Sequence, residues 1–149
     1  MDAFIRLENV SMLYGNNGTS AVALSDVSLT IEAGEYVVIT GESGAGKSTL
    51  LTILGGLQVP SSGAVLMKGV NLSSLSADRL ADFRKETIGF IFQAYHLLPY
   101  LTARENVMVP MEIARKTDPA GRARRLLDEV GLSDRGHHYP SQLSGGEQQ

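Results

Sequence analysis

The sequence contains no cysteine, so the chain can form no disulfide. A domain of this length buries about 68–70% of the surface that its unfolded chain exposes, which is enough for a core without covalent cross-links. A chain without cysteine also fits a reducing, cytosolic compartment.

Positive charge is not in excess either. The 13 Lys and Arg residues and the 16 Asp and Glu residues give a formal net charge of -3. Nucleic-acid-binding domains that act through counterion release need a positive face, so we expect no nucleic-acid partner. The one basic cluster, at Arg122, Arg124 and Arg125, is predicted to be a solvated surface.

Long apolar runs are missing as well. No stretch approaches the roughly 20 apolar residues that cross a bilayer, and residues 1–3 do not begin a signal peptide. We therefore expect any contact with a membrane to go through a partner. With 43% hydrophobic and 19% charged residues, the composition is that of a folded globular domain.

Two kinds of strand are predicted. Apolar and polar residues alternate over 5–8 and 27–32, which is typical of half-exposed strands in an antiparallel layer. The segment Gly15 to Gly18 between them is predicted to be a loop. Continuous apolar runs at 36–39 and 88–92 instead predict strands buried on both faces of a parallel sheet.

Local signals mark the remaining elements. The apolar residues between Leu50 and Leu57 have helical spacing and predict a helix after Ser48, with Gly55-Gly56 weakening its last turn. Thr102-x-x-Glu105 forms a capping box. A strand is predicted at 64–67, followed by a turn at Lys68-Gly69, and a helix capped by Ser76 is predicted to carry Leu80 and Phe83. Pro110 is predicted to kink or end the helix that follows Thr102. A last helix is predicted to begin at Asp118-Pro119 and to end at Gly131.

The segment from Gly41 to Ser48 matches the pattern G-x-x-x-x-G-K-[ST]. A predicted buried strand precedes it and a predicted helix follows it, so backbone N–H groups and a helix N-terminus can converge on phosphates. Gly44 and Gly46 let the backbone approach, Lys47 supplies a charge for the β- and γ-phosphates, and Ser48 offers a hydroxyl to Mg²⁺. The phosphate-contacting residues are predicted to be Gly41, Glu42, Ser43, Gly44, Ala45, Gly46, Lys47, Ser48 and Thr49. The alternative is a glycine-rich turn with a solvated lysine.

A second motif, Leu143-Ser144-Gly145-Gly146-Glu147, is a helix start. Ser144 and Glu147 stand at capping-box spacing, and the two glycines leave N–H groups uncovered for an anion. Taken alone, this pattern is more often an ordinary helix N-terminus.

Together these motifs resemble the ATP-binding subunits of ABC transporters, most closely the lipoprotein-release and macrolide-export branch. The resemblance covers nearly the whole chain. Residues 41–48 match Walker A, Gln93 after 88–92 matches the Q-loop, and Leu143 to Glu147 match the signature, with glutamate at Glu147 where many such subunits have glutamine. Residues 97–107 also look like this branch.

The resemblance implies roles for further residues. Ser144, Gly145 and Gly146 would act in trans on the nucleotide of a second ATP-binding subunit in a head-to-tail dimer. Gln93 would reach Mg²⁺ and the attacking water and would link the nucleotide to a transmembrane permease. The catalytic residues implied in this chain are Lys47 and Gln93. Tyr14 matches the aromatic residue that stacks on adenine. The alternative for Gln93 is a polar residue at a strand end without a role in binding. The alternative for Tyr14 is an ordinary tyrosine at a strand end.

The fold implied is α/β: a P-loop NTPase core with an antiparallel β-subdomain and a helical subdomain, lacking the C-terminal part of the sheet. Residues 1–92 would form the core and β-subdomain, and residues 93–149 would form the Q-loop and helical subdomain. Walker B, the catalytic glutamate and the switch histidine of the family lie beyond the signature, so we read the chain as truncated.

The function implied is that of the ATP-binding subunit of an export or lipoprotein-release system at the cytoplasmic face of the bacterial inner membrane, with ATP and Mg²⁺ as cofactors. We expect this chain to bind ATP weakly without hydrolysing it. The alternatives are a non-catalytic or regulatory ABC ATPase of the cell-division type and, in another class, a kinase or GTPase using the same loop.

Three other groups of residues are not predicted to be sites. Asp128-Glu129 imitates a Walker B ending, but its surroundings have helical spacing, so a solvated helix face is expected. His137-His138 has no further metal ligands at suitable spacing and is assigned to a surface loop. His96 lies before the signature and is not the switch histidine.

Overall fold

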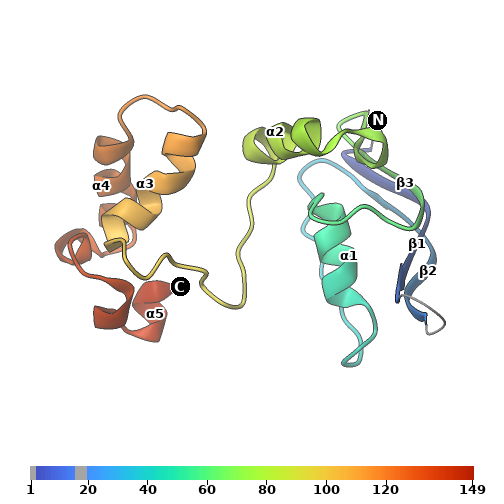
Figure 1. Cartoon of the computed structure of the whole chain (residues 1–149), viewed down its shortest axis with the longest axis horizontal. Coiled ribbons are helices and arrows are strands. Elements are labelled where there is room, and N and C mark those ends of the chain that lie inside the picture. Colours follow the sequence, from blue (N-terminus) through green and yellow to red (C-terminus); the bar gives the residue numbers. More distant parts are fainter. Residues whose placement is uncertain (1–2, 16–19) are drawn as a thin grey trace. The chain divides into compact units, whose positions relative to one another are not determined.

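The computed structural model describes residues 3–15 and 20–149. Three of the four residues of the predicted 15–18 loop therefore lie outside the described part. The chain divides into two compact units, Met1–Gly89 and Phe90–Gln149, which are described separately (Figure 1). The assignment of ATP-binding core and helical subdomain to residues 1–92 and 93–149 remains a prediction.

An antiparallel sheet forms one side of the first unit. Its strands are β1 (Ile5–Tyr14), β2 (Ala21–Ile31), β3 (Ser62–Met67) and β4 (Val70–Asn71), in the order β2-β1-β3-β4. Leu7 pairs with Leu29 on one side and with Val65 on the other. The predicted antiparallel layer is confirmed, and the turn at Lys68-Gly69 has positive φ at both residues, as a type I′ hairpin turn requires.

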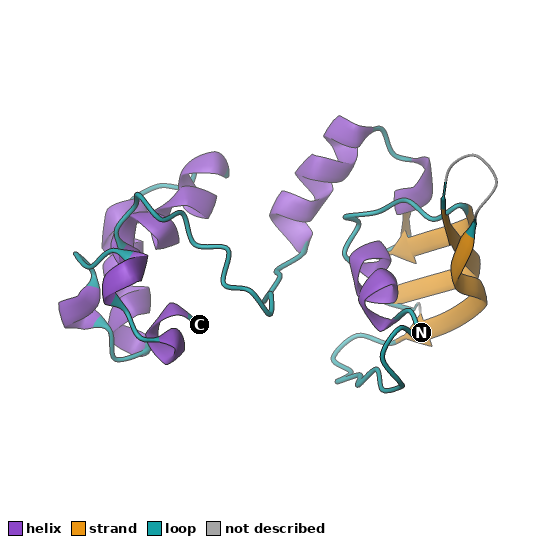
Figure 2. Ribbon diagram, turned by 60° about the horizontal axis from the view of Figure 1, so that its bottom comes forward, coloured by secondary structure: helices purple, strands orange, loops and turns teal. Residues whose placement is uncertain are grey.

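Two helices accompany this sheet. Helix α1 (Lys47–Leu54) lies against one face of it (Figure 2), and α2 (Ala77–Thr87) follows a 3-10 turn at Leu72–Ser74. Apolar residues of the sheet, of both helices and of the 3-10 turn share one core, namely Leu7, Val10, Leu24, Ile53, Leu54, Val65, Met67, Leu72 and Leu80. Burial of these side chains holds α1 against the sheet, and the two α1 residues in the core are the last two of the helix.

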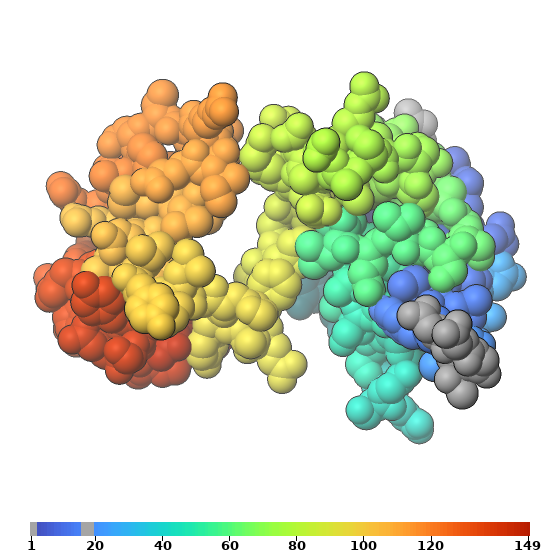
Figure 3. Space-filling model, in the orientation of Figure 1, coloured from blue at the N-terminus to red at the C-terminus, as the bar shows by residue number. Residues whose placement is uncertain are grey.

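The two predicted parallel strands do not form. Residues 36–39 and 88–92 have no strand pairing, and Tyr36, Val38 and Ile91 are 93%, 65% and 92% exposed. A strand needs a neighbour to bond its backbone groups, and the sheet in the described residues consists of antiparallel strands alone. The segment leading into α1 accordingly projects from the first unit (Figure 3).

Helices α3 (Ala103–Ile113), α4 (Pro119–Glu129) and α5 (Gly145–Gln148) form the second unit, with 3-10 turns at Ser133–Arg135 and Pro140–Gln142. Helices α3 and α4 pack side by side (Figure 1). The buried apolar side chains in the described part of this unit are Ala103, Ala123, Leu127, Pro140 and Leu143.

The helix ends follow the local signals, with one exception. Ser76, Thr102 and Asp118 accept the expected capping bonds, and Gly131 has φ 74° just after α4. Pro110 neither begins nor ends a helix. Helix α3 continues to Ile113, and Ala114 N still donates to the Pro110 carbonyl at 3.0 Å, so of the two predicted outcomes the end at Pro110 is wrong, while the kink stays a prediction.

Within residues 3–15 and 20–149, no helix has both the length and the apolar character needed to span a bilayer.

Candidate functional site

The loop from Gly41 to Gly46 joins the projecting segment to α1, and three of its glycines have positive φ. Gly41, Gly44 and Gly46 have φ values of 151°, 85° and 86°. Gly46 is the N-cap of α1 and has no side chain to cap it, so it leaves the first-turn amides of the helix uncovered. Uncovered amides at a helix start attract anions.

The reason for glycine differs between two of these positions. A Cβ on Gly46 would clash with the Ala23 carbonyl of β2 and lie 3.0 Å from Leu24 Cδ2, whereas a Cβ on Gly44 would meet nothing within 4 Å. Gly46 is therefore required for the close packing of α1 on β2. Gly44 leaves the backbone open, as the sequence predicts.

Lys47 is the first residue of α1, and its side chain folds back over the loop. Its ammonium Nζ donates to the carbonyls of Gly41 at 2.9 Å and Glu42 at 2.6 Å. A positive charge is thus held at the loop while the side chain is half-buried. This is the position from which an ammonium can interact with a phosphate group.

The same loop borders a pocket of about 260 Å³. Its lining comes from β2, from the loop and from the first turn of α1, through Ala23, Ser43, Gly44, Gly46, Lys47, Ser48 and Thr49. A lysine ammonium, backbone amides and three hydroxyls are donors suited to a phosphate chain, and the exposed Ser48 hydroxyl is also a suitable oxygen ligand for Mg²⁺. The residues present therefore fit a Mg²⁺-bound phosphate ligand.

Tyr14 lies at the end of β1 in the same unit. Its hydroxyl donates to Gln58 Oε1 at 2.7 Å, and the side chain is 39% exposed. An exposed ring with a fixed hydroxyl can present a face for stacking.

Gln93 and the Ser144 motif lie in the second unit. Gln93 is exposed in a loop after the unpaired segment 88–92. Its predicted contact with Mg²⁺ and the nucleotide therefore remains a prediction.

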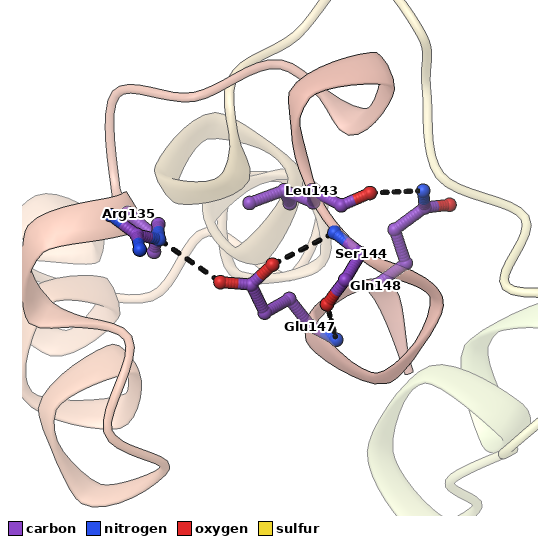
Figure 4. A network of polar contacts seen from close by, with 5 residues as sticks. All are labelled: Arg135, Leu143, Ser144, Glu147 and Gln148. Carbon is purple, nitrogen blue, oxygen red and sulfur yellow. Dashed lines mark hydrogen bonds and ion pairs between the residues drawn. The ribbon is translucent and has the colours of Figure 1, made fainter.

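The Ser144 motif begins α5 with the predicted capping box. Ser144 Oγ accepts from Glu147 N at 3.3 Å, and Glu147 Oε2 accepts from Ser144 N at 2.8 Å (Figure 4). Gln148 Nε2 donates to the carbonyls of Pro140 and Leu143, which ties the start of α5 to the preceding turn. Gly145 and Gly146 are exposed in this first turn.

Glu147 carries a second contact that the sequence does not reveal. Its Oε1 accepts from Arg135 Nε at 3.0 Å. The hydrogen bonds from the backbone and hydroxyl of Ser144, followed by that from Arg135, lower the pKa of Glu147 to about 2. The carboxylate thus stays ionised and holds the motif together.

The structure also describes the residues that the sequence does not predict to be sites. Asp128 and Glu129 are exposed on α4, which confirms a solvated face. His137 and His138 lie with their rings 4.4 Å apart, and no group of three or more His, Asp or Glu residues that could hold a metal exists in the described part of the chain. His138 Nδ1 is buried and has no partner among the described residues, a feature that nothing in the structure explains.

Sequence reasoning missed Gln58 and Arg135. Gln58 contacts Tyr14 across 44 residues, and Arg135 contacts Glu147 across 12. Neither pair has a local spacing signal, because the contacts depend on how the chain folds.

The profile of the family described as ABC transporter matches residues 24–149, which is most of the chain and includes both motifs. The chain belongs to the ABC transporter family. This membership confirms the resemblance in the sequence and disfavours the kinase or GTPase alternative.

Relatives within this family are similar over nearly the whole chain. The chain is 49% identical over 97% of its length to an uncharacterized ABC transporter ATP-binding protein of Methanocaldococcus jannaschii. It is 45% identical over 99% to the lipoprotein-releasing system ATP-binding protein LolD of Idiomarina loihiensis, and 51% over 100% to the macrolide export ATP-binding/permease protein MacB of Salmonella typhimurium. The chain spans 66%, 66% and 23% of these three proteins, respectively.

Solved ABC cassettes share the fold. A dimeric structure of the ATP-binding cassette MJ0796 in a post-hydrolysis state, bound to ADP and Pi, matches with a TM-score of 0.88 and 38% identity. The match covers 97% of this chain and 65% of that chain. This ABC chain therefore has the α/β fold of ABC ATPase cassettes, as the sequence predicts.

Proposed function

We propose that this chain is the nucleotide-binding part of an ABC-type export or lipoprotein-release system, and that residues 41–49 bind the phosphates of ATP. The observation that carries this proposal is the Lys47 ammonium, held at the loop by the Gly41 and Glu42 carbonyls beside a helix start without a side-chain cap. Family membership and the ADP and Pi of the MJ0796 cassette support the ligand class.

The chain's own groups divide the work of binding. Amides of the loop and of the first turn of α1 would donate to phosphate oxygens, while Lys47 adds one positive charge. Ser48 would hold Mg²⁺, which when bound neutralises phosphate charge. The ring of Tyr14 would stack on the adenine.

A second ATP-binding subunit is the proposed partner of the signature. Ser144, Gly145 and Gly146 would contact the nucleotide held by that subunit in a head-to-tail dimer. The exposure of both glycines in a capped first turn supports this role, and the MJ0796 cassettes are dimeric.

The other proposed partner is a transmembrane permease subunit, contacted near Gln93. MacB is named as an ATP-binding/permease protein and LolD as the ATP-binding protein of a lipoprotein-releasing system, which supports this pairing. The proposed location is therefore the cytoplasmic face of the inner membrane, as a peripheral subunit.

Hydrolysis is proposed for the transport system and not for this 149-residue chain by itself. Phosphoryl transfer to water needs charge stabilisation and a positioned nucleophile. Lys47, Ser48 and Gln93 are the groups of this sequence that the family resemblance assigns to that work. We expect weak ATP binding and no appreciable turnover.

Calorimetric titration of the chain with ATP and Mg²⁺ tests the binding claim. We expect Lys47→Ala to weaken ATP binding at least tenfold, whereas Lys116→Ala, which removes an exposed charge in the second unit, leaves it unchanged. Equal binding by the chain and by Lys47→Ala would refute the proposed site. GTP competition and phosphate release under the same conditions test base preference and turnover.

A further inference from the structure

The ring of Tyr14 is anchored at both ends. Its backbone pairs with Ala21 of β2, and its hydroxyl donates to Gln58 Oε1 at 2.7 Å. A tyrosine side chain has two torsions, so a strand at one end and a hydrogen bond at the other leave its ring little freedom. The side chain nevertheless remains 39% exposed.

Gln58 is itself tied to α1. Its backbone N donates to the Thr52 carbonyl at 3.2 Å, and its Oε1 lies 2.9 Å from the Thr52 hydroxyl, whose one hydrogen is shared between Gln58 Oε1 and the Thr49 carbonyl, also at 2.9 Å. The Gln58 side chain is half-buried. The amide oxygen therefore accepts from two hydroxyls, one on β1 and one on the helix.

This helix is the one that begins at the phosphate loop. Thr52 lies five residues after Lys47, about 7.5 Å along the axis at 1.5 Å per residue. Lys47 and Thr52 thus belong to one rigid helix. Because Gln58 is hydrogen-bonded to both Thr52 and Tyr14, it fixes the ring of Tyr14 relative to that helix. The ring is placed relative to the loop through bonds within the first unit.

We propose that Gln58 is a positioning residue for base recognition, holding the Tyr14 ring ready to stack on the purine of a bound nucleotide. The inference rests on the proposed function, since it deepens the same site. A ring that is ordered before binding loses no rotamer freedom when the ligand arrives. Gln58 would therefore add affinity for ATP and none for its phosphate chain alone.

The test compares ATP with inorganic tripolyphosphate, both with Mg²⁺, by calorimetry on the full chain. Gln58→Leu is expected to weaken ATP binding about threefold to tenfold and to leave tripolyphosphate binding unchanged. Tyr14→Phe, which keeps the ring and loses the hydroxyl, should give the same loss. The double variant should be no weaker than either single variant, because both remove one interaction.

Two further variants separate positioning from a general loss of structure. Gln58→Glu keeps an oxygen that accepts from both hydroxyls, so it should restore the ratio of ATP to tripolyphosphate affinity. Tyr100→Phe removes a hydroxyl from a side chain that is 89% exposed in the other unit, and it should change neither affinity. Urea unfolding of each variant shows whether the fold is retained.

The outcomes are distinguishable. If the chain binds neither ligand, or if Lys47→Ala binds both as well as the chain does, the proposed function fails and the inference fails with it. If the chain binds ATP through Lys47 but Gln58→Leu keeps the original ratio, only the inference is overturned. A folded Gln58→Leu that loses both ligands equally also overturns it, because the effect would not involve the base.

Discussion

Arg135 and Glu147 form an ion pair that joins the 3-10 turn at 133–135 to α5. Nε of the guanidinium lies 3.0 Å from Oε1, while the other carboxylate oxygen accepts from Ser144 N at 2.8 Å. Both oxygens of one side chain are therefore used, one toward the turn and one toward the start of the signature helix (Figure 4). Glu147 thus links two segments that are 12 residues apart.

This arrangement predicts acid sensitivity of the helical unit. The pKa of Glu147 is lowered to about 2 by its bonds from Ser144 and Arg135, against an ordinary value of 4.5. The stabilisation is therefore fully present above about pH 4.5 and is lost as the pH falls toward 2. An NMR titration of the Glu147 carboxyl should show the low midpoint.

Arg135→Ala provides the comparison for that titration. The bonds from Ser144 remain in this variant, so the pKa of Glu147 should rise and still stay below its ordinary value. Glu147→Gln should remove this part of the pH dependence of urea unfolding. A Glu147 midpoint near 4.5 in the unchanged chain would contradict the ion pair.

Gly46→Ala should destabilise the first unit by about 2–3 kcal/mol, since it combines an unfavourable φ with a clash against the Ala23 carbonyl. Gly44→Ala has nearly the same φ and open space around the new methyl, so about 1 kcal/mol is expected. Urea unfolding measures both. Equal losses would mean that α1 does not pack on β2 as closely as described.

Asn106 holds the segment before α3 in place. Its Oδ1 accepts from Leu98 N at 2.7 Å, and its Nδ2 lies within 3.1 Å of the Leu98, Leu101 and Thr102 carbonyls. Asn106→Ala should lower the stability of the helical unit by about 2–3 kcal/mol. Asn106→Asp keeps the acceptor but loses the donor, so it should be at least as harmful in the same unfolding assay.

Two valines, one buried and one exposed, test whether the segment 36–39 is exposed in this chain. Val65 of β3 is 1% exposed and Val38 is 65% exposed. Val65→Ala should therefore cost about 2–3 kcal/mol of unfolding free energy, and Val38→Ala less than about 0.5 kcal/mol. A large loss for Val38→Ala would show that residues 36–39 are buried in this chain.

Much of the helical unit could be predicted because its signals are local. The boxes at Thr102 and Ser144 each join a side chain to a backbone group three residues away, so the spacing alone implies the bond. Asp118 and Gly131 mark the ends of α4 for the same reason. The loop at 41–48 could be identified for the same reason, since its glycines and Lys47 lie within eight consecutive residues.

The sequence predicts buried strands at 36–39 and 88–92, but the structure leaves both runs unpaired and most of their side chains exposed; only Ile39 and Ile88 are half-buried against the core. Their apolar character indicates a preference for burial, but a strand forms only where a second strand bonds to it. The strands predicted from alternating residues do form, because β1 is hydrogen-bonded to β2 on one side and to β3 on the other.

The sequence by itself determined the family, the glycine-rich loop at 41–48 and the start of each helix, because these depend on neighbours a few residues apart. Only the tertiary structure decided that Gly46 packs on β2, that Gln58 holds the Tyr14 hydroxyl and that Arg135 pairs with Glu147. Each of these contacts joins residues that are distant in the chain, and the free energy of such a contact exists only after folding has brought the two groups together.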